Sequence, residues 1–202
     1  EPLEASLRFW MDKLGFSAKI AFAPYNQVFQ QLLDPTSLLS NNQGGINLIL
    51  VRVQDWDRSE DSGSANGGMG KSPSVSRAKI EKNVQDLIRA LKSAAERLAS
   101  PLVLCLCPAS ATEADGPWLL PFSKQMEDLI AGELGNIDGL IIVTSSEVAG
   151  VYPVSQCHDS GGDKLGHIPY TTLFFTSLGT LIARKIHALR SKPYKVIVLD
   201  CD

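Results

Sequence analysis

Apolar positions along the chain follow two patterns that predict different secondary structure. Uninterrupted apolar runs rich in β-branched residues are typical of strands in a covered sheet, whereas apolar residues three or four positions apart are typical of helices. Strands are predicted at 18–23, 46–53, 101–107, 138–143 and 194–199. Helices are predicted at 2–14, 24–33, 76–99, 119–134 and 171–190.

Strand and helix alternate along most of the chain. This alternation implies βαβ crossovers and hence an open, mainly parallel sheet with helices on both faces. The predicted fold class is therefore an α/β three-layer (α/β/α) sandwich. The Ser- and Gly-rich segment 59–74 and the segment 149–170 are predicted to be long connections between elements.

The composition is that of a chain able to bury a core, because 44% of its 202 residues are hydrophobic. The formal net charge of −3 argues against a nucleic acid or an anionic membrane as partner. No apolar run reaches the roughly 20 residues of a membrane-spanning helix, and the N-terminus lacks a signal-peptide pattern. Cysteines are few, and two of them lie in the predicted strand at 101–107. We therefore expect a cytoplasmic protein.

The last residues combine an apolar strand with two acids. In VIVLDCD, Asp200 and Asp202 are two positions apart, so both side chains would point the same way from a strand. The segment matches the hhhhDxD pattern of haloacid-dehalogenase (HAD) phosphatases, where the first aspartate attacks phosphorus, the second is an acid or base, and Mg²⁺ binds both. The alternative is a strand that ends in two solvated acids.

A domain rarely ends by opening a new strand. We therefore expect an α/β domain at 1–190, followed at 191–202 by a linker and the first strand of a truncated HAD-type domain. On that interpretation the phosphatase chemistry needs residues beyond Asp202, and no phosphatase turnover is expected from residues 1–202 alone.

Polar residues follow two predicted strands at the edge where open α/β sheets bind ligands. Tyr25, Asn26 and Gln27 would open a helix directly after strand 18–23 and could donate hydrogen bonds to a phosphate or carbonyl group. Arg52 and Asp55 come at the end of strand 46–53, where Arg52 would bind phosphate. The alternatives are a structural helix start capped by Asn26 and a surface ion pair of Arg52.

Six blocks of the sequence together resemble the N-terminal part of FkbH-like proteins. These are HAD-superfamily subfamily IIIC glyceryl transferase/phosphatases of polyketide and hybrid polyketide/nonribosomal peptide assembly lines. The blocks occur in the family's order and span nearly the whole chain. They are EPLEASLRFWM (1–11), FAPYNQVFQQLLDP (22–35), LILVRVQDW (48–56), LCPAS (106–110), KLGHIPYT (164–171) and KVIVLDCD (195–202).

The resemblance implies an SGNH-hydrolase-like (flavodoxin-like) α/β domain that lacks its first strand, followed by a Mg²⁺-dependent HAD part. It implies that a glyceryl unit from 1,3-bisphosphoglycerate is loaded onto the phosphopantetheine thiol of an acyl carrier protein. The expected partners are that carrier protein and neighbouring megasynthase domains. A run of basic residues is the candidate docking surface for an acidic carrier: Arg184, Lys185, Arg190, Lys192 and Lys195.

Asp163 and His167 resemble the Asp-x-x-His block of SGNH hydrolases, with one extra residue between acid and imidazole. A loop histidine ahead of a helix could act as a general base or bind a phosphate oxygen, and the alternative is a hydrogen-bonded anchor for the connection 149–170. The nucleophilic serine block of SGNH hydrolases is absent from the sequence. Ser6 is no substitute for it, because Ser6 lies within a predicted helix.

Three hypotheses follow from the sequence. The first is the N-terminal domain of an FkbH-like module. The second is a non-catalytic structural or carrier-docking domain of a megasynthase. The third is a stand-alone SGNH esterase or acyltransferase.

Overall fold

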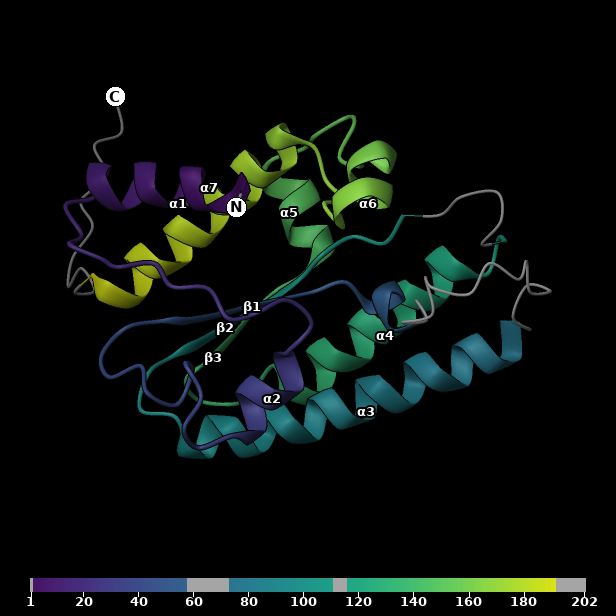
Figure 1. Ribbon diagram of the computed structural model, residues 1–202, viewed down its shortest axis with the longest axis horizontal. Helices are drawn as coiled ribbons and strands as arrows, with labels where there is room; N and C mark the ends of the chain where they lie inside the picture. The colour runs from purple at the N-terminus through teal and green to yellow at the C-terminus, as the bar shows by residue number, and fades with distance from the viewer. Residues whose placement is uncertain (1, 58–72, 111–115, 192–202) are drawn as a thin grey trace, which may run out of the picture. The chain divides into compact units, whose positions relative to one another are not determined.

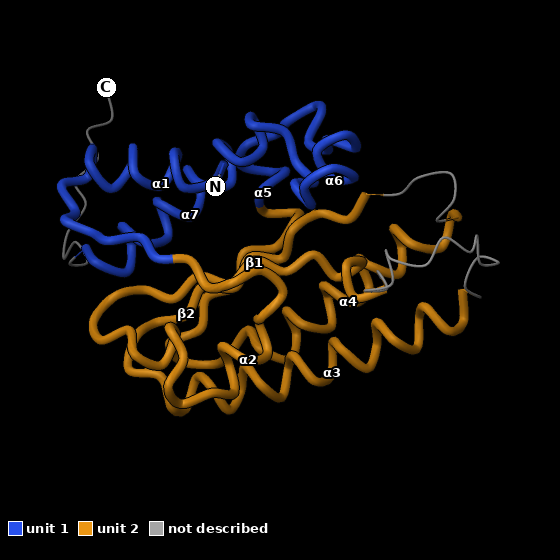
Figure 2. Tube along the Cα trace, viewed as in Figure 1, with its two compact units in different colours: residues 1–21, 148–202 blue, residues 22–147 orange. Residues whose placement is uncertain are grey.

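The computed structural model describes residues 2–57, 73–110 and 116–191. The chain divides into two compact units (Figure 2): unit 1 comprises residues 1–21 and 148–202, and unit 2 comprises residues 22–147. The HAD-like residues Asp200 and Asp202, and the strand predicted at 194–199, lie outside the described residues.

Unit 2 contains an all-parallel sheet, which in the described part of the chain has three strands. Their order is β1 (Asn47–Val51), β2 (Leu102–Leu106) and β3 (Leu140–Val143). All five residues of β2 are buried, as expected for the uninterrupted apolar run of a central strand. The predicted α/β class with a parallel sheet is confirmed, and the arrangement is compatible with a three-layer α/β/α fold.

Three helices of unit 2 cover one face of this sheet (Figure 1). They are α2 (Val28–Leu33), α3 (Pro73–Arg97) and α4 (Leu119–Leu134). Ile80, Leu87 and Leu91 recur at helical spacing on α3 and form one core cluster with alternate strand residues such as Ile49 and Leu104. Each fully buried leucine or isoleucine of this kind stabilises the fold by about 1.5–3 kcal/mol.

In unit 1, helices α1 (Pro2–Lys13) and α7 (Thr172–Arg190) pack against each other. Trp10 Nε1 on α1 donates a hydrogen bond to Thr180 Oγ1 on α7 at 3.0 Å. Gly179 lets the helices approach closely, since a Cβ built there would lie 2.7 Å from Ser6 Cβ. The predicted ends of both helices are confirmed to within one residue.

The connection 149–170 contains regular structure. Helix α5 (Ser145–Val151) reaches into it from unit 2, and helix α6 (Ser160–Gly166) lies within it. His158 and Tyr170 form an isolated antiparallel bridge that joins its two sides.

The predicted strand at 18–23 is wrong. These residues are irregular and largely exposed, with Phe22 46% exposed. A strand needs a hydrogen-bonded neighbour and an apolar surface to cover, and this short run has neither among the described residues. The helix predicted from Pro24 accordingly begins later, at Val28.

Among the residues that the structure describes, no helix combines the length and the apolar character needed to span a bilayer.

Candidate functional site

The carboxyl ends of β1, β2 and β3 meet at one edge of the sheet. Cys107, just beyond β2, donates its backbone N–H to the carbonyl oxygen of Val51 at the end of β1 (2.8 Å). Cys105 of β2 pairs with Val143 at the end of β3. The segments that follow the three strands therefore start side by side. Ligands of open α/β sheets bind at such an edge, which makes it the candidate site.

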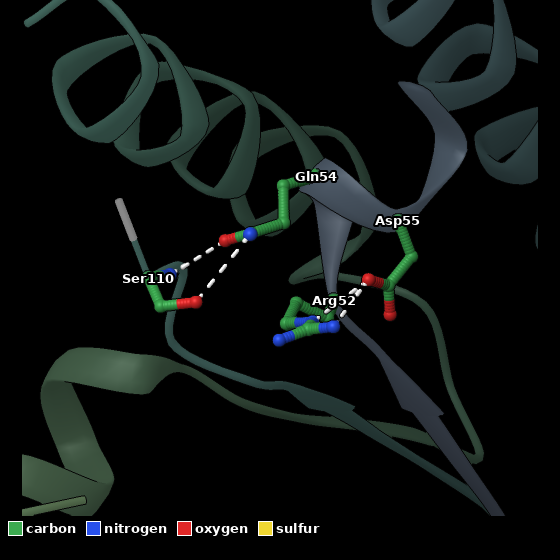
Figure 3. Close-up of polar contacts among 4 residues, drawn as sticks. All are labelled: Arg52, Gln54, Asp55 and Ser110. Atoms are coloured by element: carbon green, nitrogen blue, oxygen red, sulfur yellow. Dashed lines mark hydrogen bonds and ion pairs between the residues drawn. The ribbon is translucent and has the colours of Figure 1, made fainter. Parts of the chain in front are cut away.

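Arg52 and Asp55 form an ion pair directly after β1 (Figure 3). Arg52 precedes the 3₁₀ helix η1 (Val53–Asp57), and Asp55 lies within it. Nε and Nη2 of Arg52 donate to the same carboxylate oxygen, Oδ1 of Asp55, at 2.8 and 2.6 Å. The Arg52 side chain is 4% exposed and that of Asp55 30%. The structure thus shows an ion pair whose arginine is buried, and phosphate binding by Arg52 stays a prediction.

Gln54 joins η1 to the loop after β2 (Figure 3). Its Oε1 accepts a hydrogen bond from the backbone N–H of Ser110 at 2.5 Å, and its Nε2 lies 3.5 Å from Ser110 Oγ. The short bond carries most of this link, because hydrogen bonds weaken with distance. Gln54 was not a sequence candidate, since no local pattern relates it to a residue 56 positions away.

Tyr25, Asn26 and Gln27 do not follow a strand, so the predicted strand-to-helix anion site is not formed as expected. Gln27 is the N-cap of α2, and its side chain makes no capping hydrogen bond. Asn26 precedes this N-cap and has a φ of 61°, a left-handed conformation that asparagine tolerates. Tyr25 is 69% exposed.

The first turn of α2 nevertheless lies beside η1. The rings of Phe29 and Trp56 are in contact, with their centroids 6.3 Å apart. Tyr25 and Gln27 therefore precede a helix that is held next to the Arg52–Asp55 pair through an aromatic contact. A binding role for Tyr25, Asn26 and Gln27 stays a prediction.

Asp163 and His167 lie in unit 1, whereas Arg52 and Asp55 lie in unit 2. Asp163 is part of α6, and His167 is its C-cap with a left-handed φ of 53°. The backbone N–H of His167 donates to the carbonyl oxygen of Asp163 at 3.2 Å. This capping geometry fits the anchor interpretation of His167, and its general-base role stays a prediction.

A buried carboxyl group at the end of β3 was missed by the sequence analysis. Glu127 on α4 is 3% exposed, and its Oε2 accepts a hydrogen bond from Ser145 Oγ at 2.5 Å. Burial raises the pKa of Glu127, and the hydrogen bond from Ser145 opposes this rise by favouring the ionised form. The signal in the sequence was a glutamate at helical spacing from Ile130 and Leu134, on a mainly apolar face.

Ser123 lies one turn before Glu127 on the same helix. It is 1% exposed, and its Oγ makes no hydrogen bond to any other described residue. A buried hydroxyl without a partner costs about 1–3 kcal/mol. Together, Ser123 and Glu127 place two polar groups on the core-facing side of α4.

No group of three or more His, Cys, Asp or Glu residues that could hold a metal ion is found within residues 2–57, 73–110 and 116–191. The predicted Mg²⁺ ligands, Asp200 and Asp202, are not among these residues. Comparisons with models of protein families, with curated proteins and with solved structures found no match.

Proposed function

We propose that this chain is the N-terminal, SGNH-hydrolase-like domain of an FkbH-like module. Such a domain helps to load a glyceryl-type acyl unit from 1,3-bisphosphoglycerate onto the phosphopantetheine thiol of an acyl carrier protein. The proposal begins from the six sequence blocks that resemble this family. The parallel α/β sheet of unit 2 is compatible with it.

The observation that carries the proposal is the meeting of three of these blocks in unit 2. Block 22–35 contacts block 48–56 through Phe29 and Trp56. Block 48–56 in turn contacts block 106–110 through Gln54 and Ser110. Segments that resemble one family and lie far apart in the sequence thus come together at the ligand-binding edge of an α/β sheet. A chance resemblance of isolated peptides does not require this convergence.

In the proposed module the two parts have different roles. The edge of unit 2 would orient the acyl donor or the carrier arm, with Arg52, Asp55 and the residues before α2 nearest to it. The HAD part would begin at the strand predicted for 194–199, with Asp200 as nucleophile, Asp202 as acid or base, and both aspartates as the residues that would hold Mg²⁺. Basic residues of α7, including Lys185 and Arg190, are the proposed docking surface for the acidic carrier.

The test uses a polypeptide that continues beyond Asp202 through the proposed HAD part. It is incubated with Mg²⁺, 1,3-bisphosphoglycerate and a holo carrier protein, and the carrier is weighed by mass spectrometry. We expect the carrier to gain the mass of a glyceryl group, and Asp200→Asn to abolish the gain. A carrier of unchanged mass, with a folded polypeptide, would refute the glyceryl assignment.

A non-catalytic docking domain is the second candidate, and one observation favours it. Arg52, the predicted phosphate ligand, is already paired with Asp55 and buried, so this domain could act by holding a partner. Titration of residues 1–202 into a ¹⁵N-labelled carrier protein separates the two. Docking would shift carrier resonances, and the shifts should be lost in a Lys185→Glu, Arg190→Glu variant. If the longer polypeptide also transfers no glyceryl group, these results would favour docking alone.

A further inference from the structure

The Ser145 hydroxyl and the Glu127 carboxyl form a hydrogen-bonded pair at the carboxyl end of β3. Besides the 2.5 Å bond from Ser145 Oγ to Glu127 Oε2, the backbone N–H of Ser145 donates to the same carboxyl group. Thr144 Oγ1 accepts a hydrogen bond from the backbone N–H of Glu147 at 3.1 Å, which fixes the turn that carries Ser145. The pair is therefore held in place from both β3 and α4.

The burial of Glu127 is not explained by a cation. Within the described residues, the cation that acts on this carboxyl group is Lys124, which is itself paired with Asp128 at 2.9 Å and is 45% exposed. The same face of α4 otherwise buries Phe122, Met126, Ile130 and Leu134.

An apolar side chain at position 127 would complete this apolar face. A carboxyl group there carries a desolvation cost that packing does not require. Costs of this kind are concentrated at functional sites. Ser123 lies four residues before Glu127 and is buried on the same face of α4. Its hydroxyl makes no hydrogen bond to a described residue, so it adds a second desolvation cost next to Glu127.

We propose that Ser145 and Glu127 form a catalytic dyad that accepts an acyl group from an activated ester or thioester. Ser145 is the nucleophile and Glu127 is its general base. A serine nucleophile needs a base within hydrogen-bond reach, about 2.6–3.2 Å or closer, and it must be accessible to substrate. On this proposal Ser145, which is half-buried, meets the substrate, and Glu127, which is buried, acts as the base out of contact with bulk water.

The chemical step needs no other reagent. The Ser145 Oγ–H proton passes to Glu127 Oε2 as Oγ forms a bond to the acyl carbon. The bond from that carbon to the alcohol or thiol breaks, and the leaving group takes the proton from Glu127. Water, activated by the same carboxylate, then attacks the Ser145 ester and returns free acid and free serine.

This dyad is independent of the glyceryl assignment. It uses residues of unit 2 and neither His167 nor Asp200 and Asp202. Glyceryl transfer and acylation of Ser145 can therefore fail separately.

The pH dependence follows from the requirement for ionised Glu127. The rate of acylation should rise with pH as the carboxyl group loses its proton, and should then level off. Lys124 and Asp128 are the charged groups on α4 that act on this carboxyl. Charged side chains on the elements around it include Asp55 and Asp57 on η1 and Glu147 on α5. They also include Arg77 and Lys92 on α3, which contact α4 at Phe122 and Glu133.

The test treats the 202-residue chain with a fluorophosphonate probe and, separately, with p-nitrophenyl acetate. The modified residue is located by peptide mass spectrometry. We expect modification of Ser145, none in Ser145→Ala, and unchanged modification in Ser146→Ala, which alters an exposed neighbouring serine. No modification of the wild type, or modification that persists in Ser145→Ala, would overturn the proposal.

Variants of the base separate catalysis from folding. Glu127→Gln keeps an acceptor for the Ser145 hydroxyl but cannot take its proton, so we expect acylation to slow roughly a hundredfold and to lose its dependence on pH. Glu127→Asp should restore part of the rate and the pH profile. Circular dichroism establishes that each variant is folded. A folded Glu127→Gln that reacts at the wild-type rate would show that Glu127 only positions the helix.

Discussion

Arg52 reaches Asp55 across the first turn of η1 with two nitrogens on a single carboxylate oxygen, while its own side chain is 4% exposed. If the Asp55 carboxylate is lost, less of the desolvation cost of the buried Arg52 guanidinium is offset. Removing one partner of a buried ion pair is therefore destabilising. Because Asp55 is 30% exposed, solvent reduces that cost. We expect Asp55→Asn to lower the free energy of unfolding by about 1–2 kcal/mol, measured by urea denaturation.

The matched control is the pair of Asp86 and Arg89 on α3, which has the same three-residue separation. Its side chains are 35% and 75% exposed, so Asp86→Asn should change the free energy of unfolding by less than about 0.5 kcal/mol. Equal losses in the two variants would mean that burial of Arg52 contributes nothing to the strength of its pair.

Gln54 holds Ser110, in the segment after β2, through a side-chain hydrogen bond. The Gln54 carbonyl group accepts the Ser110 N–H, so Gln54→Ala should expose that amide and accelerate its hydrogen exchange, with a loss of about 1 kcal/mol in stability. Gln54→Glu keeps an acceptor oxygen and should retain slow exchange. An unchanged exchange rate of the Ser110 amide in Gln54→Ala, followed by NMR, would contradict a link between these two segments.

Glu127 should make stability fall as pH rises. Burial raises the folded-state pKa of Glu127 above the ordinary value of 4.5. At a pH between the ordinary pKa and the folded-state pKa, the folded protein therefore holds a proton that the unfolded chain has released. Stability is then fully present below the ordinary pKa and is lost as pH rises through the folded pKa. Glu127→Gln cannot titrate, so the stability of the wild type relative to this variant should decrease across that window.

Ser145→Ala provides the companion measurement. The Ser145 hydrogen bond favours the ionised carboxyl group, so its removal should raise the pKa of Glu127 further and extend the window to higher pH. Urea titrations of the three proteins from pH 4.5 to neutral pH test both statements. A wild-type stability that rises over this range relative to Glu127→Gln would show that the pKa is not raised.

The sequence predicted the parts of the fold that depend on local periodicity. The apolar positions of α3 and α4 recur at helical spacing over many residues, and the run at 101–107 is apolar throughout, so both helices and β2 were correctly predicted. The run at 18–23 is also mainly apolar but pairs with no strand among the described residues. Strand formation depends on pairing and cover, which a local pattern cannot reveal.

The candidate site was predictable to the extent that its residues are close in sequence. Arg52 and Asp55 are three positions apart after a strand, so their proximity could be inferred. Ser145 and Glu127 are 18 residues apart and meet only because α4 packs beside the end of β3. Gln54 and Ser110 likewise meet through the register of β1 and β2. These contacts are consequences of the tertiary structure.

Gly179 of α7 lies in close contact with Ser6 and Leu3 of α1 in unit 1. A Cβ at this position would clash with Ser6 Oγ and would lie 2.7 Å from Ser6 Cβ and 3.3 Å from Leu3 Cδ1. Alanine is more favourable in a helix than glycine by about 1 kcal/mol. Overpacking typically costs about 1–3 kcal/mol, which equals or exceeds this gain in helix propensity. We expect Gly179→Ala to lower the melting temperature of the protein.

Gly132 on α4 is the control for this substitution, because a Cβ there meets no heavy atom within 4 Å. Gly132→Ala should therefore raise the free energy of unfolding through propensity alone, by up to about 1 kcal/mol. Ser6→Gly removes the clashing side chain, together with its 3.3 Å hydrogen bond to the carbonyl oxygen of Thr176, and should make Gly179→Ala less harmful in the double variant than in the single one. If Gly179→Ala and Gly132→Ala stabilised the protein equally, helix propensity rather than the contact between α1 and α7 would decide which residue position 179 accepts.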